Sequence, residues 1–472
     1  MKKKITCLVS VVFAMCSAWA QLPEQFDARD LGWITEVKDQ SQLGTCWTFA
    51  TTSLFETSYI RAGLGTKDNT DFSEWQMANY AHPQSLNEYT TPYYSDDNSS
   101  DWGGSSLNIG YYAQAQFSSV FVTEANAPYP LQAISEQENL SSLIPSQRAR
   151  TLGSAIVSRY GNAEANMGLS EASAFSATDV SFVKNKVQEF GSARIGMPWS
   201  SDAISQNLAE QTIYNNTTGA SAGLHATTIV GWDDSVDVGD GKTGAFIVKN
   251  SWASEWGNDG YYYLAYDSYV GDANLSWLEV SDASHLTSAY STLPSLDGTD
   301  ENYAPFINFD SISAATKIDL DHTSSHDDTL LSLGMLGAEG DTYRLSLYDG
   351  DEVDSIDGLD VMSLLYQEDQ TLGTSGFQMF DLAETVDVSE VDDLWLVYES
   401  IGLGSVALYE YDENALSEDL SFTLSEDGTW EGATASNTLA GVNFYMIPEP
   451  STILLFSIIG GGLLVYRRNL CV

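Results

Sequence analysis

Basic residues are scarce in this sequence. Only 19 lysines and arginines stand against 66 aspartates and glutamates, which gives a formal net charge of −47. A surface of this sign repels a phosphate backbone, so the composition excludes nucleic acid as a partner. The same acidity keeps an exported protein soluble, and we interpret it as solvated surface. We expect no cofactor, with calcium in an acidic loop as the alternative.

Long apolar runs are scarce as well, and the two that stand out lie at the ends of the chain. The first 20 residues are typical of a secretory signal: lysines at positions 2–4, an apolar stretch over 5–15 and the small-residue site Ala18-Trp19-Ala20. That stretch is too short to span a bilayer. We therefore expect an exported protein whose mature chain begins at Gln21.

The second apolar run covers residues 453–466. Pro448-Glu449-Pro450-Ser451 precedes it, and Arg467 and Arg468 follow it at once. This layout resembles the bacterial PEP-type sorting tail, whose transmembrane segment is cut by an exosortase-type transpeptidase. The resemblance implies an exosortase-type sorting enzyme as a partner, transient membrane anchoring through residues 446–472, and a final location in the cell envelope or on the extracellular surface. A permanent C-terminal membrane anchor is the alternative.

Cysteine is almost absent once these ends are set aside. Of the four cysteines, Cys7 and Cys16 lie in the signal and Cys471 lies beyond the second apolar run. Only Cys46 remains, so we expect no internal disulfide in the mature chain. Because a lone thiol is a liability in an oxidising compartment unless it does chemistry, Cys46 is a candidate nucleophile.

The segment around Cys46 resembles the active-site segment of the papain family of cysteine peptidases. The resemblance covers residues 37–50, Val-Lys-Asp-Gln-Ser-Gln-Leu-Gly-Thr-Cys-Trp-Thr-Phe-Ala, and the preceding Phe-Asp-Ala-Arg at 26–29. It places Cys46 in the first turn of a long buried helix. Backbone N–H groups and the dipole of a helix start stabilise negative charge, so we expect the sulfur to ionise near neutral pH. A buried, inert cysteine is the alternative.

One histidine and one asparagine lie in motifs that also resemble this family. His225 opens the strand-like run 226–232, and Asn250 lies in residues 248–262, which begin Val-Lys-Asn-Ser-Trp. The resemblance implies that His225 is the base, that Asn250 orients its ring, and that Trp252 shields their hydrogen bond. We expect a resting pair of thiolate and imidazolium. The other four histidines, such as His82 in a polar loop, lack this context.

Three further residues are assigned to the site by resemblance. Gln40 would donate its side-chain amide to the developing oxyanion, together with the N–H of the nucleophile. Gly103 and Gly104 resemble the glycine pair that lines the cleft, where absent side chains let an extended substrate pair with the backbone. We expect Gly103, Gly104 and Trp252 to bind substrate, although a simple turn is an equally good local interpretation of the glycines.

The sequence departs from the family pattern at two features. Leu43 stands where the family's signature has a cysteine, so apolar packing must replace the usual nearby disulfide. The spacing from Cys46 to His225 is also longer than in compact members. We expect insertions near residues 96–101 and 135–166, and an acidic loop over 233–244, because loops tolerate extra length.

The sequence pattern of the C-terminal half differs from that of the preceding residues. Short alternating stretches at 342–348, 377–382, 394–398 and 406–411 predict strands of a β-sandwich. The pattern resembles the lectin-like domains that follow some prokaryotic papain-type peptidases. The acidic run 349–360 offers oxygen ligands of the kind that calcium prefers, but a solvated turn is the simpler interpretation and we assign no metal ligands.

The sequence therefore predicts an α+β protein in four parts. Residues 1–20 form the signal, 21–290 a two-lobed papain-like peptidase with a helical lobe and a β-barrel-like lobe, 300–445 an all-β lectin-like sandwich, and 446–472 the sorting signal. The expected function is an exported cysteine endopeptidase that hydrolyses proteins or peptides through an acyl-enzyme intermediate. The alternatives are a thiol acyltransferase or amidase, and a surface adhesin that binds glycan or extracellular matrix.

Overall fold

The computed structural model describes most of residues 22–447. Not described are the two ends, 1–21 and 448–472, and the internal segments 81–121, 137–139, 144–154, 163–174, 176, 271–273, 287, 292–305, 312, 321–328, 338, 351–355, 357–360, 374–375, 402–405, 411–420, 425–429, 433–437 and 440–441. The predicted signal, the predicted sorting tail, Gly103 and Gly104 therefore lie outside the described residues. So does most of the acidic run 349–360.

The first lobe is helical. It is built on α1 (Cys46–Arg61), α2 (Glu74–Tyr80), α5 (Leu131–Ser135) and the 3-10 turn η2 (Leu140–Leu143). Helix α1 is buried from Trp47 to Ser58, which confirms the predicted buried helix. Leu43 packs in a cluster with Phe49, Trp75 and Tyr129, so apolar contacts do occupy the place of the missing cysteine.

The second lobe is a twisted sheet covered by one helix. Its elements are β1 (Gln25–Asp27), β2 (Ala155–Asn162), α6 (Ala177–Phe190), β3 (Ala193–Trp199), η3 (Ser201–Ala203), β4 (Ile204–Gln206), β5 (Thr212–Tyr214), β6 (Gly223–Gly239), β7 (Lys242–Lys249), β8 (Tyr261–Ala265) and β9 (Asn274–Asp282). The strands follow the order β2-β9-β3-β6-β7-β8-β5-β4, with β1 on β6. Val183, Val187 and Phe190 of α6 pack on Ile195 and Trp277 of the sheet.

The prediction of an acidic loop over 233–244 is wrong, because this segment forms a long β-hairpin. Strand β6 continues to Gly239 and β7 starts at Lys242, with irregular register between Asp233 and Lys242. Val236 and Val238 alternate with polar residues and pack against Ile213. That alternation outweighs the acidic composition, because each valine buries its side chain on the same face.

The regular elements described in the C-terminal half are β-strands. Its strands are β10 (Ser288–Ser291), β11 (Phe306–Ser311), β12 (Ser313–Asp319), β13 (Thr329–Gly337), β14 (Thr342–Asp349), β15 (Ser363–Thr371), β16 (Gly376–Asp387), β17 (Asp393–Ser400), β18 (Val406–Glu410), β19 (Ser421–Leu424), β20 (Trp430–Gly432), β21 (Thr438–Leu439) and β22 (Val442–Ile447). The sheet β15-β14-β17-β12-β19-β20 faces the strands β22, β13 and β16. Leu333, Leu345 and Leu396 fill the interior between them. The α+β prediction and the four predicted strands are confirmed.

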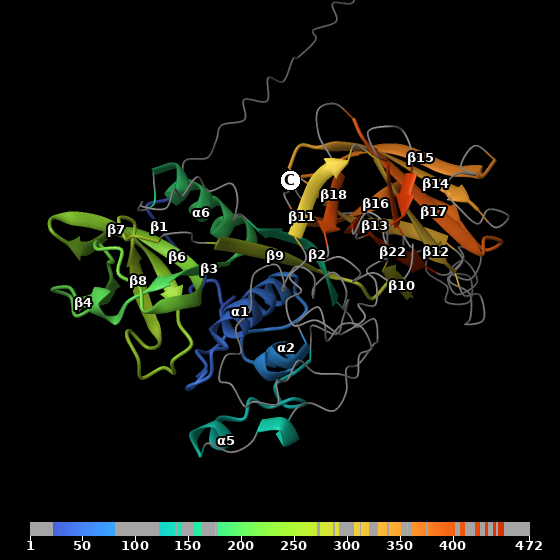
Figure 1. Cartoon of the computed structure of the whole chain (residues 1–472). Coiled ribbons are helices and arrows are strands. Elements are labelled where there is room, and N and C mark those ends of the chain that lie inside the picture. Colours follow the sequence, from blue (N-terminus) through green and yellow to red (C-terminus); the bar gives the residue numbers. More distant parts are fainter. Residues whose placement is uncertain are drawn as a thin grey trace, which may run out of the picture.

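The two halves share one sheet. Strand β2 of the second lobe pairs with β9 on one side and with β16 of the sandwich on the other, so a 13-stranded sheet crosses the junction. Figure 1 shows β9 and β2 reaching from the green lobe to the orange domain. The approach is close at Gly376, where an added Cβ would lie 2.1 Å from the carbonyl oxygen of Tyr160 and φ is +110°. The position therefore requires glycine.

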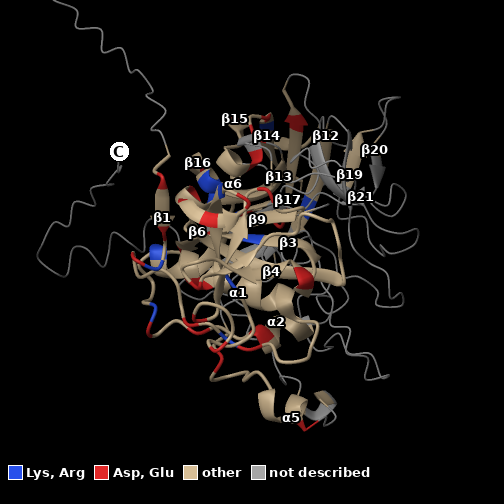
Figure 2. Ribbon diagram, turned by 90° about the vertical axis from the view of Figure 1, so that its left-hand side faces the viewer, with Lys and Arg blue, Asp and Glu red and all other residues tan. Residues whose placement is uncertain are grey.

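The described surface carries its acidic residues on loops and strands of both halves, with fewer basic residues between them (Figure 2). Within the described ranges, no helix is long and apolar enough to cross a membrane.

Candidate active site

Cys46 lies at the first position of α1, as the sequence predicts. Its thiol is free and half-buried. The backbone N–H groups of Ala226, Trp47 and Cys46 are near enough to the sulfur to lower the pKa of its thiol. The contact with Ala226 brings the start of α1 in the helical lobe against β6 in the other lobe. The nucleophile candidate therefore lies where the two lobes meet.

His225 is the neighbour of that contact and is 5 % exposed. Its Nε2 lies 2.9 Å from Oδ1 of Asn250, which follows the end of β7. Trp252 stacks on the imidazole with ring centroids 4.7 Å apart and planes 19° apart. Because Nε2 faces Asn250, Nδ1 is the ring nitrogen that remains for the sulfur.

Gln40 joins the same set from the segment before α1. Its backbone N–H donates to Ser251 O, and its Oε1 accepts from the Ser251 hydroxyl at 2.6 Å. Its Nε2 donates to Leu43 O at 2.8 Å. An amide nitrogen carries two hydrogens, so this bond uses one of them. The structure thus brings together Cys46, His225, Asn250, Gln40 and Trp252.

Burial acts on both titratable groups. Burial raises the pKa of the Cys46 thiol above its ordinary value, although the Ala226 N–H, the positive charge of Arg194 and the N–H groups of the helix start lower it in part. Burial also lowers the pKa of His225 to about 4, against the effect of its bond with Asn250. Each group by itself therefore favours its neutral form. For the sulfur, this direction is opposite to the one that the sequence predicts.

A family model matches this part of the chain. The model of the papain family of cysteine proteases covers residues 22–276, which is more than half of the chain. The chain belongs to the papain family. The match includes both lobes and every residue of the candidate site described above.

Curated relatives of this papain-family chain come from distant organisms. A cathepsin L-like proteinase of Fasciola hepatica is 28% identical over 246 residues, which are 52% of this chain and 60% of that protein. Human cathepsin O is 27% identical over 252 residues, 53% of this chain and 63% of that protein. The chain thus spans about 60% of the length of these relatives.

One solved structure resembles nearly the whole chain. It contains the cysteine protease and lectin-like domains of Cwp84, a surface layer associated protein of Clostridium difficile. The two structures superimpose with a TM-score of 0.62 over 91% of this chain and 89% of that one, at 20% sequence identity. The likeness concerns the fold: a papain-like domain followed by an all-β domain.

Tryptophans enclose the histidine of the papain-family site. Trp199 meets the His225 ring edge-on at 5.0 Å between centroids, and Trp256 packs edge-on against Trp252. Trp199 also stacks on Tyr214 at 4.4 Å. Trp252 is predicted by its motif, whereas Trp199 is not, because it lies at the end of β3 outside the recognised segments. These rings pack around the imidazole that bonds Asn250.

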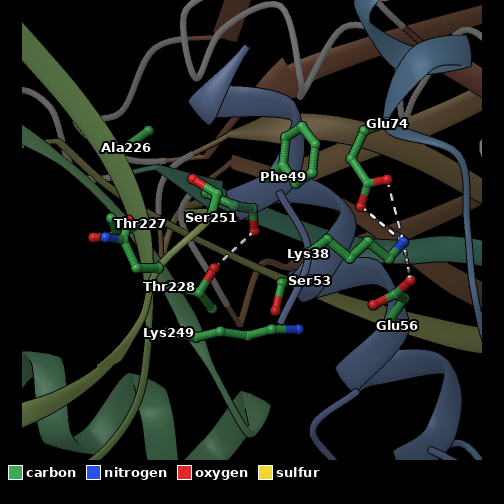
Figure 3. A pocket seen from close by; sticks show the side chains of 12 residues that line it. Lys38, Phe49, Ser53, Glu56, Glu74, Ala226, Thr227, Thr228, Lys249 and Ser251 are labelled. Carbon is green, nitrogen blue, oxygen red and sulfur yellow. Dashed lines mark hydrogen bonds and ion pairs between the residues drawn. The ribbon is translucent and has the colours of Figure 1, made fainter. Parts of the chain in front are cut away.

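A cluster of buried charges ties together the segments that carry the site (Figure 3). Lys38 Nζ lies 3.2 Å from Glu56 Oε1 and 2.9 Å from Glu74 Oε1. Lys249 donates to the Thr35 hydroxyl at 3.0 Å, and that hydroxyl donates to Glu56. Lys38 precedes Gln40 by two residues, Glu56 shares α1 with Cys46, and Lys249 adjoins Asn250. No motif predicts this cluster, because its members are distant in the chain.

The ionisation of this cluster is shifted by its burial. Burial lowers the pKa of Lys249 to about 8. Burial likewise raises the pKa of Glu74 to about 8. Burial would also lower the pKa of Lys38, but the carboxylates of Glu56 and Glu74 outweigh that effect and raise it. Because each of these groups loses hydration when it is buried, we expect the cluster to add little net stability and to fix how the segments that carry the site meet.

Proposed function

We propose that this chain is an exported cysteine endopeptidase that hydrolyses peptide bonds with Cys46 as nucleophile, His225 as base and acid, and Asn250 as the group that orients the imidazole. The observation that carries the proposal is the 2.9 Å contact between His225 Nε2 and Asn250 Oδ1, beside a free thiol at a helix start. That contact fixes the ring so that Nδ1 is available to the sulfur.

Proton transfer from sulfur to nitrogen opens the reaction. His225 Nδ1 takes the thiol proton, and the thiolate attacks the carbonyl carbon of the scissile bond. Although burial disfavours each charge alone, a thiolate and an imidazolium side by side stabilise one another, so the pair is favoured together. The Asn250 oxygen accepts from Nε2–H and supports the imidazolium.

The oxyanion and the leaving group need separate partners. The carbonyl oxygen of the tetrahedral intermediate would accept from the Cys46 N–H and from Gln40 Nε2, whose second hydrogen is not used by Leu43 O. The imidazolium then protonates the leaving amine, and a thioester remains on Cys46. Water activated by His225 hydrolyses this acyl-enzyme and restores the thiol.

The chain's organisation completes the proposal. Residues 1–20 are the export signal, 21–290 the peptidase, 300–445 the β-sandwich, and 446–472 an exosortase-type sorting tail that holds the chain briefly in the membrane. Gly103 and Gly104 line the substrate cleft together with Trp252. The likeness to a surface layer associated protease with a lectin-like domain supports a location at the cell surface, with glycan or matrix as a ligand of the sandwich.

One experiment tests the proposed activity. The purified chain and its Cys46→Ala variant are assayed on an unfolded protein and on a small peptide ester. We expect hydrolysis by the parent and a loss of at least about 10⁴-fold in the variant. Ser53→Ala, on the same helix, is the control and should retain activity. Equal turnover by parent and Cys46→Ala would refute the proposal, and retained polysaccharide binding without turnover in either would favour an adhesin.

A further inference from the structure

Strand β3 presents two different faces. Ala193, Ile195 and Met197 point into the apolar core beneath α6. Since side chains alternate along a strand, Arg194 and Gly196 face the other side, toward α1. The register agrees, because Arg194 pairs with Thr228, and Thr228 donates its hydroxyl to the carbonyl oxygen of Ala50 at 3.1 Å. Ala50 lies one turn after Cys46.

The guanidinium of Arg194 is directed along this face toward the nucleophile. Arg194 is 2 % exposed, and its Nη1 donates to Oδ1 of Asn274 at 2.6 Å. That oxygen lies over Gly196, where an added Cβ would meet it at 2.8 Å. Gly196 in turn pairs with Ala226, whose N–H contacts the Cys46 sulfur. The side chain therefore leans from position 194 toward the sulfur across a residue that has no side chain.

The charge of Arg194 acts on the sulfur. Its positive charge is among the causes that lower the pKa of Cys46. In a buried setting, a cation stabilises a neighbouring anion more than it would in water.

We propose that Arg194 is a positioning cation of this site: its guanidinium stabilises the Cys46 thiolate from the sheet side, while His225 acts from the other. The inference rests on the proposed role of Cys46. It adds a residue from β3 that lies outside the three recognised segments. If Arg194 instead only tied β3 to β9 through Asn274, its removal would change stability and leave the ionisation of the sulfur unchanged.

The test measures the ionisation of Cys46 without requiring peptidase activity. The rate of alkylation of the full chain by iodoacetamide is followed against pH for the parent, Arg194→Met and Arg194→Lys. We expect Arg194→Met to raise the thiol pKa by about one unit and slow alkylation at pH 7 up to about tenfold. Arg194→Lys keeps the charge and should recover most of the rate. The same series in a His225→Ala background isolates the effect from the imidazole.

Two further variants keep the test decisive. Arg61→Met removes a cation from the far end of α1, about 22 Å from Cys46, and should leave the alkylation profile unchanged. Asn274→Asp retains Arg194 but places a carboxylate on it, so the thiol pKa should rise even if Arg194→Met does not fold. Profiles of Arg194→Met or Asn274→Asp that superimpose on the parent would overturn the inference. A shifted profile in a chain that hydrolyses no peptide would refute the proposed function and leave this inference standing.

Discussion

The region where the two lobes meet contains buried polar groups, whereas the interior of the β-sandwich is apolar. Between the lobes, Glu56, Glu74, Lys249 and His225 are each at most 7 % exposed and are held by hydrogen bonds and ion pairs. The sandwich interior is filled by aliphatic and aromatic side chains. Buried polar networks fix geometry at a cost in stability, whereas apolar packing supplies stability with little positional demand. Substitutions in the two regions should therefore have different signatures.

The largest expected effect is at the lobe interface. His225→Ala should lower kcat/KM for a peptide substrate by about 10⁴-fold, because the thiol loses its proton acceptor and the leaving amine its donor. The unfolding midpoint should change little, since Trp252 and Trp199 still pack around the smaller residue. Steady-state kinetics with urea unfolding checks both quantities. A large loss of stability with normal turnover would contradict the expected difference between the lobe interface and the sandwich.

The reverse signature is expected in the sandwich. Leu396→Ala removes a side chain that is fully buried in β17 and should cost about 3 kcal/mol of unfolding free energy, measured by urea titration. Turnover per folded molecule should stay the same. Leu364→Ala is the matched control, because this leucine is 53 % exposed on edge strand β15 and should change stability by under about 0.5 kcal/mol.

A variant at the junction asks whether the two regions unfold separately. Gly376→Ala places a Cβ against Tyr160 O at a positive φ and should cost about 2 kcal/mol. Hydrogen exchange should show weaker protection in β2 and β9 as well as in β16, because the shared pairing is lost. Gly373→Ala has only the Gln378 amide oxygen nearby, at 3.7 Å, and is the control. Weaker protection confined to β16 would show that the two halves unfold independently.

The smallest effect concerns the charge cluster. Burial raises the pKa of Glu74 from 4.5 to about 8, so between these values the folded protein binds this proton more tightly than the unfolded chain. Glu74 therefore makes stability fall as pH rises from about 5 to 8. Glu74→Gln should make this fall in the free energy of unfolding smaller by at least about 1 kcal/mol across the range, measured by urea titrations. Asp71→Asn, at an exposed partner of Lys38, should keep the parental slope.

Local sequence predicts the residues of the candidate site, but it does not predict the strand pairing at the junction of the two halves. Cys46, His225 and Asn250 stand in contiguous segments whose neighbours prescribe a helix start, a strand and a loop, and the structure brings them together. The roles assigned to them remain proposals. Strand β2 has no such signal, because it falls in a stretch expected to be an insertion and its partner β16 is more than 200 positions later. Pairing across such a distance depends on the packed whole rather than on local pattern.

Two other omissions have different causes. Lys38, Glu56, Glu74 and Lys249 are ordinary charged residues in sequence, and only folding shows that they meet, with the last three buried. The hairpin over 233–244 has a signal in the sequence, since Val236 and Val238 alternate with polar residues. The acidic composition of the segment instead favours a loop. Arg194 belongs with the first group, because a single arginine in a strand gives no sign of which face it occupies.

The pairing of strand β22 affects how the chain responds to a pulling force. It lies between β10 and β13 and pairs antiparallel with both, and it is the last described strand. Tension applied to the chain beyond Ile447 would load both rows of hydrogen bonds in shear, so they must break together rather than one at a time. Strand β22 is therefore expected to resist extraction when the chain is pulled from beyond Ile447.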